Sequence, residues 1–280
     1  MTRPPIDLAP LRRRRQRRIL VQLACIGVSA FLLLPIVLIG LSALSSRTAL
    51  TEFPKPLLPS EFDTESVLGF IGGTGVVPAF GNSVLVGVYT VALALLLGAP
   101  AGYALSRFDF RGRDAYQVLI LLVRALPIVV LSVPLATMFL RVGVDDTVFA
   151  VTLVHTALAL PTTILITASI FVGVPRDVEE AALVFGCTPL QAMRRVVLPM
   201  ALPGLAASSV FTFVLSWNEV LGAAVLTLGH RTLPAQVLAS LADSPNAYRF
   251  AGGFVLVLPA LLFIFLMRRY LLNMWGTTLR

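Results

Sequence analysis

The sequence predicts an all-α membrane protein with six transmembrane helices, and two observations lead to this prediction. Charged residues make up 13% of the 280 residues and hydrophobic residues 57%, whereas a soluble domain of this size has about a quarter of its residues charged. Crossing the hydrocarbon core takes about 20 apolar residues in a helix, because backbone polar groups cannot stay unpaired in lipid. Six such runs occur, at residues 19–44, 82–106, 116–140, 148–172, 205–226 and 251–272.

Prolines inside these runs predict kinks rather than helix ends, since neighbouring helices can satisfy the freed carbonyl groups. They are Pro127, Pro134, Pro161 and Pro259. The first run follows a cluster of arginines, as the apolar part of a signal peptide would, but it is longer than the about 7 to 15 apolar residues that signal peptides use. We therefore expect it to be a retained anchor helix.

The loops on one side of the predicted bundle carry many more positive residues than the loops on the other side. One side holds Arg3, the cluster at 12–18, Arg107, Arg111, Arg113, Arg176, Arg194, Arg195, Arg268, Arg269 and Arg280. The other side holds Arg47, Lys55, Arg141, Arg231 and Arg249. The positive-inside rule then predicts that both termini are cytoplasmic in the plasma (inner) membrane of a bacterium. The net charge of +8 is attributed to this topology and not to nucleic-acid binding.

These spans and loops divide the chain into consecutive regions. They are a basic cytoplasmic segment at 1–18, a first transmembrane helix at 19–44, an external loop at 45–81, a core of five transmembrane helices at 82–272 and a cytoplasmic tail at 273–280. The core includes a cytoplasmic loop at 173–204 that is far longer than a turn requires.

The local sequence of this long loop predicts two short amphipathic helices that lie at an angle under the membrane. Pro175 fits the first turn of one helix, and Gly186 supplies its stop. Thr188 is placed to cap a second helix, which Pro199 is expected to end. From these features alone, the pair could simply connect two spans as an interfacial segment.

The spacing of particular residues in the loop is more specific than its amphipathic pattern. Glu180-Ala181-Ala182 is followed after three residues by Gly186 and after nine more by Val196-Val197-Leu198-Pro199. This series resembles the EAA loop of binding-protein-dependent ABC transporter permeases, whose consensus is EAA, x3, G, x9, I, x, LP. Valine here takes the place of the consensus isoleucine.

The resemblance extends over residues 53–272, where the chain is similar to the maltose-type carbohydrate permease subunits. It is carried by the segments at 58–62, 101–108 and 110–113, by Pro127, Pro134-Leu135, Asp146-Thr147, Leu160-Pro161, Trp217-Asn218-Glu219 and by Leu233-Pro234. Two positions depart from the family pattern. Phe185 stands where the family usually has Asp, and the tail at 275–280 lacks the usual ending.

The resemblance implies a type I ABC importer permease fold whose loop docks in a cleft of a separate ATP-binding subunit. The coupling residues would be Glu180, Ala181, Ala182, Gly186, Leu198 and Pro199. It also implies a second, non-identical permease subunit, a dimer of ATP-binding subunits and an extracytoplasmic substrate-binding protein. A carbohydrate substrate rests on the resemblance alone, and glycerol phosphate or another polar solute is the alternative.

Motifs for catalysis are missing from the sequence. A P-loop requires a lysine that reaches the nucleotide phosphates, and the one lysine, Lys55, lies in a predicted external loop. No nucleophile motif, zinc pattern or paired-carboxylate site is present, and Cys25 and Cys187 suggest neither a disulfide framework nor a metal site. We therefore expect a transport subunit without a cofactor of its own, with ATP and Mg bound by the partner subunit.

Polar residues inside transmembrane segments are candidates for function. The predicted spans contain Arg124, His155, Trp217, Asn218 and Glu219. Our hypothesis is that Glu219, Asn218 and His155 face the interior of the bundle and help line the translocation path. The alternatives are a static polar pair between helices, a snorkelling Arg124 and a packing role for Trp217. A secondary transporter and a membrane scaffold are the other function classes considered.

Overall fold

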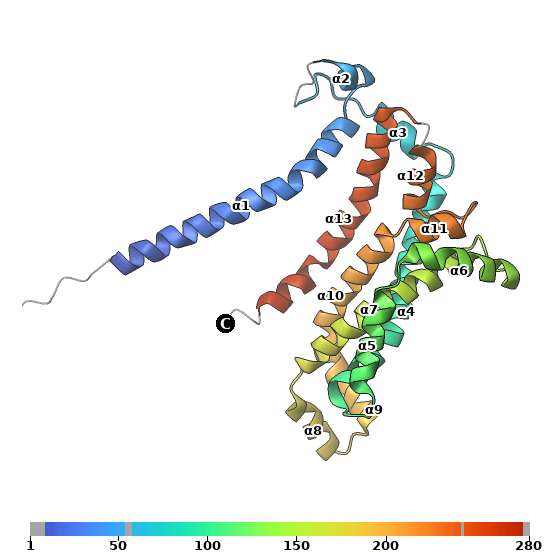
Figure 1. The fold of residues 1–280 in the computed structure, drawn as a ribbon. Helices are drawn as coiled ribbons and strands as arrows, with labels where there is room; N and C mark the ends of the chain where they lie inside the picture. Colours follow the sequence, from blue (N-terminus) through green and yellow to red (C-terminus); the bar gives the residue numbers. More distant parts are fainter. Residues whose placement is uncertain (1–8, 54–57, 242–243, 277–280) are drawn as a thin grey trace, which may run out of the picture. The chain divides into compact units, whose positions relative to one another are not determined.

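The computed structural model describes residues 9–53, 58–241 and 244–276, and most of these residues are helical (Figure 1). The chain divides into two units, one formed by Met1–Gly69 with Pro245–Phe254 and the other by Phe70–Ser244 with Val255–Arg280. The boundaries fall inside α3 (Glu65–Ile71) and α13 (Asn246–Gly276). Each unit is described by itself. The ends of the predicted basic segment and of the predicted tail, at 1–8 and 277–280, lie outside the described residues.

The first unit is built around α1 (Ala9–Ala43), the predicted anchor helix. Its span is apolar and long enough to cross a membrane. The region at 45–81, predicted as an external loop, contains α2 (Arg47–Thr51) and α3. An isolated antiparallel bridge joins Ser45 to Phe62, and the guanidinium of Arg47 lies 5.9 Å from the ring centre of Tyr248.

The second unit is organised by α4 (Val76–Arg107), α7 (Val148–Val172) and α10 (Leu198–Asn218). The prediction for α7 matches its observed bounds, whereas α4 begins six residues before the predicted start at 82. Buried hydroxyl groups link the three helices. The Thr167 hydroxyl donates to the Gly98 carbonyl of α4 at 3.0 Å, and the Thr163 and Thr212 hydroxyls of α7 and α10 are 3.0 Å apart.

Glycine allows α4 and α7 to approach closely. Gly102 is buried in α4, and a Cβ atom there would lie 2.7 Å from the backbone nitrogen of Ala168 and also against the Thr167 hydroxyl. Lipid tails are as apolar as leucine, so that helices in a membrane gain little from burying apolar surface and depend on close packing and on hydrogen bonds. Gly102 provides such a contact.

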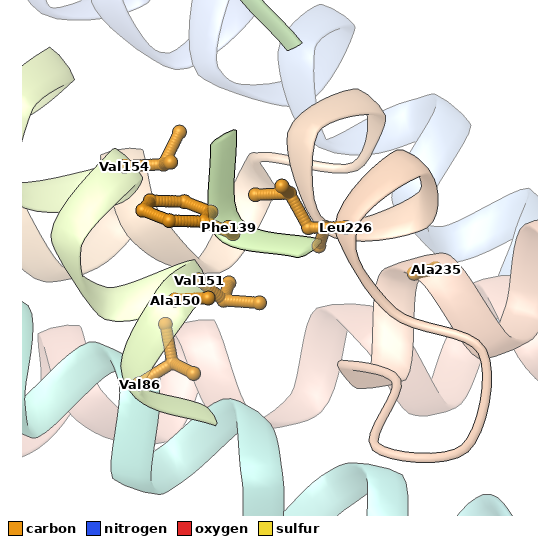
Figure 2. Close-up of a cluster of buried hydrophobic side chains, with 8 residues drawn as sticks. Val86, Phe139, Ala150, Val151, Val154, Leu226 and Ala235 are labelled. Carbon is orange, nitrogen blue, oxygen red and sulfur yellow. The ribbon is translucent and has the colours of Figure 1, made fainter. Parts of the chain in front are cut away.

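A second packing centre joins the other ends of these helices to shorter elements. Figure 2 shows Phe139 and Leu226 close to valine and alanine side chains. The cluster consists of Val86, Phe139, Ala150, Val151, Val154, Ala223, Leu226 and Ala235. Its members come from α4, α6 (Ile128–Val142), α7, α11 (Leu221–Leu226) and α12 (Leu233–Leu241). The cluster therefore holds five elements of the second unit together.

The third predicted span, at 116–140, is not one continuous helix. It is divided into α5 (Arg113–Arg124) and α6, which meet at a bend of 87° (Figure 1). Pro127 has an extended backbone with ψ 129° and is the N-cap residue of α6, and a proline disfavours a helical conformation in the residue before it. The predicted kink at Pro127 was therefore wrong, and the helix ends there. Pro134, Pro161 and Pro259 lie inside helices, as predicted.

The second half of the long loop at 173–204 also differs from the predicted structure. The first helix is present as α8 (Arg176–Val184), but Pro175 precedes it as the N-cap residue. The second helix does not end at Pro199, because α9 (Pro189–Ala192) continues through one turn of π-helix, η1 (Met193–Val197), into α10. A proline ring clashes with the carbonyl four residues earlier in an α-helix. The wider π turn just before Pro199 relieves this clash.

The predicted fifth span, at 205–226, ends earlier than expected. The helix α10 stops at Asn218, Glu219 has an extended backbone with ψ 121°, and α11 starts separately at Leu221. Within the described residues, five unbroken helices are long and apolar enough to span a membrane, and the bent pair α5–α6 makes a sixth if it counts as one. The prediction of six spans holds in this sense.

The close approach of α4 and α7 predicts a cost for any side chain at Gly102. Gly102→Ala should destabilise the protein by about 1–3 kcal/mol, because the added methyl group overpacks a tight contact. The measurement is the midpoint of thermal unfolding of the detergent-solubilised chain. Gly27→Ala in α1 is the matched control, since a Cβ atom at Gly27 meets no atom within 4 Å. An equal midpoint for the two variants would contradict the close approach.

Candidate functional site

The helices α8 and α9, together with the turn between them, form a segment that we call the knob, defined as residues 173–192. Asp177 and Glu179 in the first turn of α8 place negative charge at the positive end of the helix dipole. The helix ends at Gly186, whose φ is +90°. The Cys187 N–H donates to the Ala182 carbonyl and the Gly186 N–H to the Leu183 carbonyl, both at 3.0 Å. This is the pattern of a glycine-terminated helix, so the predicted stop at Gly186 is confirmed.

The start of α9 is fixed by a reciprocal cap. The Gln191 N–H donates to the Thr188 hydroxyl at 3.3 Å, and the Thr188 N–H donates to the Gln191 side-chain oxygen at 3.0 Å. Pro189 occupies the first helical position, where the missing N–H group is of no consequence. The predicted cap at Thr188 is confirmed, and the knob is a turn with both of its helix ends defined.

The residues of the EAA-like series lie at different depths in the structure. Glu180, Ala181 and Gly186 are exposed, whereas Ala182 is buried. Leu198 and Pro199 lie beyond the knob, in the first turn of α10. The knob therefore presents the first half of the series on its surface, and the last two residues belong to the span that follows.

The surface of the knob also carries apolar side chains whose exposure the sequence argument did not predict. Val184 and Phe185 are 85% and 88% exposed. A signal was available, because two large apolar residues directly precede the glycine that ends α8. Exposed apolar groups beside charged ones are typical of a surface that another protein covers.

The inner side of the knob is tied to the end of α4 by an ion pair that the sequence argument missed. Arg107 Nε lies 2.8 Å from Glu179 Oε2, and the two side chains are 6% and 13% exposed. The Tyr103 hydroxyl donates to the other carboxylate oxygen of Glu179. Tyr103 and Arg107 are four residues apart in α4, so they share one face. This spacing was the available signal, but the partner is 76 residues away.

Two contacts between side chains and carbonyl groups reinforce this connection. Arg107 Nη2 donates to the Val174 carbonyl at 2.8 Å, just before α8. Arg176 Nη2 donates back to the Ser106 carbonyl near the end of α4 at 3.3 Å. Each arginine thus satisfies a carbonyl group of the other element. The end of α4 and the start of α8 are joined by four polar contacts in total.

A second polar cluster lies inside the spans, where α10 gives way to α11. His155 in α7 is fully buried, with Nδ1 2.9 Å from the Ser216 hydroxyl and Nε2 3.1 Å from Glu219 Oε2. Glu219 also accepts hydrogen bonds from the Gly222 and Ala223 N–H groups at 2.9 and 3.2 Å. It therefore caps α11 while it pairs with His155. The structure brings these two predicted site residues together.

The other three predicted path residues have different surroundings. Trp217 is 3% exposed, donates from its indole N–H to the Leu256 carbonyl at 3.1 Å and stacks on Phe213. Asn218 is exposed and, with Trp217, borders a cavity of about 200 Å³. Arg124 is exposed in the last turn of α5. Packing accounts for Trp217, whereas Asn218 and Arg124 are accessible polar groups.

Asp146 fixes the turn that precedes α7 at its opposite end from the knob. Its φ is +50°, and its carboxylate accepts hydrogen bonds from the N–H groups of Leu228, Gly229 and His230 at 2.8, 2.9 and 3.0 Å. Partial burial by itself would raise the pKa of Asp146. The three backbone donors and the His230 side chain outweigh that effect and hold the pKa below its ordinary value of 3.8.

Comparison with known proteins gives a family match for this chain. Residues 91–273 match the family described as binding-protein-dependent transport system inner membrane component. The chain is similar to the trehalose transport system permease protein SugB of Mycobacterium tuberculosis, with 31% identity over 248 residues that cover 86% of this chain and 90% of the relative.

Another relative and a solved structure agree with this match. The diacetylchitobiose uptake system permease protein NgcG of Streptomyces coelicolor is 32% identical over 240 residues, 84% of this chain and 79% of that protein. A solved bacterial ABC transporter involved in the import of the polysaccharide alginate has a chain with a TM-score of 0.70 at 22% identity. The alignment covers 96% of this chain and 99% of that one. This likeness supports the type I importer permease fold.

The Asp146 contacts predict the behaviour of three amide groups. Asp146→Asn should speed hydrogen exchange at Leu228, Gly229 and His230 about tenfold, because a charged acceptor is replaced by a neutral one. Asp145→Asn is the matched control. The folded pKa of Asp146 is depressed, so the carboxylate contributes fully above its ordinary pKa and loses its effect as pH falls through the folded pKa. Protection, corrected for intrinsic rates, should decline only in that acidic range in the unsubstituted chain. Equal protection in both variants would contradict the clamp.

Proposed function

Because this chain belongs to the family of binding-protein-dependent transport system inner membrane components, we propose that it forms half of the path by which an ATP-driven importer moves a carbohydrate. The chain is a multi-pass membrane permease, which is a transport subunit. Two relatives are named for trehalose and diacetylchitobiose. These names support a carbohydrate as the substrate class.

The observation on which the coupling proposal rests is the surface of the knob. Glu180 is exposed at a turn whose geometry is fixed by Gly186 and Thr188. A rigid segment that presents the Glu180 carboxylate near Val184 and Phe185 can dock on a partner with a basic group and an apolar cleft. We assign that partner as a dimer of ATP-binding subunits. ATP and Mg would be bound there, and this chain would hold no cofactor.

The proposed topology assigns a side of the membrane to each site. The arginine asymmetry places both termini, and with them the knob, on the cytoplasmic side of a bacterial inner membrane. The turn at Asp146 lies at the other end of α7 and would then face outward. An extracytoplasmic substrate-binding protein would deliver the solute on that side. A second, non-identical permease subunit would complete the path.

The proposed path uses the polar groups at the end of α10. Asn218 and Trp217 border a cavity, and a carbohydrate is bound by hydrogen-bonding groups together with apolar or aromatic faces. His155 and Glu219 set the break between α10 and α11 that exposes Asn218. Arg124, at the end of α5, is proposed as a further polar group of the path.

Gly186 is the position at which the coupling proposal is most directly tested. Gly186→Pro should abolish coupling between ATP hydrolysis and uptake in the reconstituted complex, because proline requires a negative φ and the knob needs +90°. The measurement is uptake of labelled substrate and substrate-stimulated ATP hydrolysis in proteoliposomes.

Gly112→Pro is the matched control for Gly186→Pro. Gly112 also has a φ of +90° and an open environment, but it precedes α5, outside the knob. A complex that keeps uptake with Gly186→Pro, or that loses it equally with Gly112→Pro, would contradict a specific role for the knob. Failure of any ATP-binding subunit to co-purify with the unsubstituted chain would contradict the function itself.

Glu219→Gln separates a role in the path from a static one. The Gly222 N–H donates to Oε1 of Glu219 and the Ala223 N–H to Oε2, so the single amide oxygen of glutamine can keep one of the two bonds that cap α11 while the charge is lost. We expect uptake to fall about tenfold in assembled complexes, which corresponds to about 1.4 kcal/mol in the barrier. His155→Ala should lower uptake at least as much. Wild-type uptake with Glu219→Gln would instead identify a structural cap.

A further inference from the structure

The two neighbouring glutamates of the knob face different surroundings. Successive residues of an α-helix are separated by about 100° around its axis, so Glu179 and Glu180 cannot share one face of α8. Glu180 is exposed, whereas the side chain of Glu179 is 13% exposed and paired with Arg107. One carboxylate is therefore free for a partner, and the other is engaged within the chain.

We propose that Glu179 is a positioning residue that locks α8 to α4, so that a displacement of the knob moves α4 with it as one body. This inference rests on the proposed function, in which a partner subunit displaces the knob. It assigns a role to a residue outside the EAA-like series. It also names the span that receives the movement.

The burial and opposite charges of the ion pair suit such a lock. Breaking a buried pair by removing one charge leaves the other uncompensated, which makes the paired state strongly preferred. Both carboxylate oxygens of Glu179 are engaged, one by Arg107 and one by the Tyr103 hydroxyl. The contacts of Arg107 with Val174 and of Arg176 with Ser106 resist rotation of α8 about the pair.

The lock is continuous with the close contact between α4 and α7 at Gly102. Tyr103 and Arg107 follow Gly102 in α4, where α4 lies against Thr167 and Ala168 of α7. Tyr103 also packs edge-on against Phe171 of α7, with ring centres 5.5 Å apart. Packed elements of this kind can carry energetic coupling between distant sites.

The first experiment uses the whole complex of both permeases, the ATP-binding subunits and the binding protein in proteoliposomes. Glu179→Gln should lower the amount of substrate taken up per ATP hydrolysed about tenfold, within the range of coupling between sites, while hydrolysis continues. A residue needed only for folding would lower uptake and hydrolysis together. An unchanged ratio would overturn the proposal.

Two further variants keep this measurement decisive. Asp109→Asn removes an exposed ion pair with Arg113, at 2.7 Å, and should leave the ratio unchanged. Tyr103→Phe removes one hydroxyl group and keeps both charges, so it should assemble even where Glu179→Gln does not. It should lower the ratio by a smaller factor, and an unchanged ratio in assembled Tyr103→Phe complexes would equally overturn the proposal.

The second experiment does not depend on the ATP-binding subunit. The two native cysteines are first removed with Cys25→Ser and Cys187→Ser. Cysteines that carry spin labels are then introduced at the exposed positions Asp177 in α8 and Leu97 in α4. We expect one narrow distance distribution in lipid nanodiscs and a broadened one after Glu179→Gln. Equal widths would overturn the lock even if the chain proves to be a permease. If the distribution broadens as expected but no ATP-binding subunit co-purifies with the unsubstituted chain, the lock is supported and only the proposed function is contradicted.

Discussion

The close approach of α4 and α7 around Gly98 and Gly102 sets the positions of the other elements of the second unit. Helices in lipid gain little from burying apolar side chains against one another, so their association depends on short backbone distances and on hydrogen bonds. The Thr167 hydroxyl meets the Gly98 carbonyl at 3.0 Å, which is possible only because no side chain stands between the two backbones. The helix α10 is attached to this pair through Thr163 and Thr212.

Polar side chains hold the functional regions at the two ends of this framework. At one end, the Arg107–Glu179 pair joins α4 to the knob. At the other end, Asp146 holds residues 228–230 through three backbone N–H groups. His155 and Glu219 define the break after α10 between these ends. Each site therefore depends on a contact between elements far apart in the sequence.

In the proposed division of labour between Glu179 and Glu180, one small surface segment is both accessible and rigid. An exposed carboxylate needs neighbours that keep its helix in place, because docking a mobile helix costs the conformational entropy that is lost when the helix becomes ordered. Glu179 supplies that restraint from the inner face. Gly186 and the Thr188–Gln191 cap fix the turn on the outer side. The surface residues are then free to contact a partner.

The sequence by itself determined the helical class, the apolar runs and the local ends of several helices. Thr188 and Gly186 act through hydrogen bonds to residues at most five positions away, so their roles are readable from spacing. Tertiary structure decided the 87° bend after α5, the passage of α9 into α10 through Pro199, and the pairing of Glu179 and of Glu219. A hydropathy average over neighbouring residues locates an apolar run, but it does not show where the helix within that run ends. Whether a proline ends a helix or lies within it depends on the backbone around it. The partner of a buried charge is chosen by helix packing across many residues.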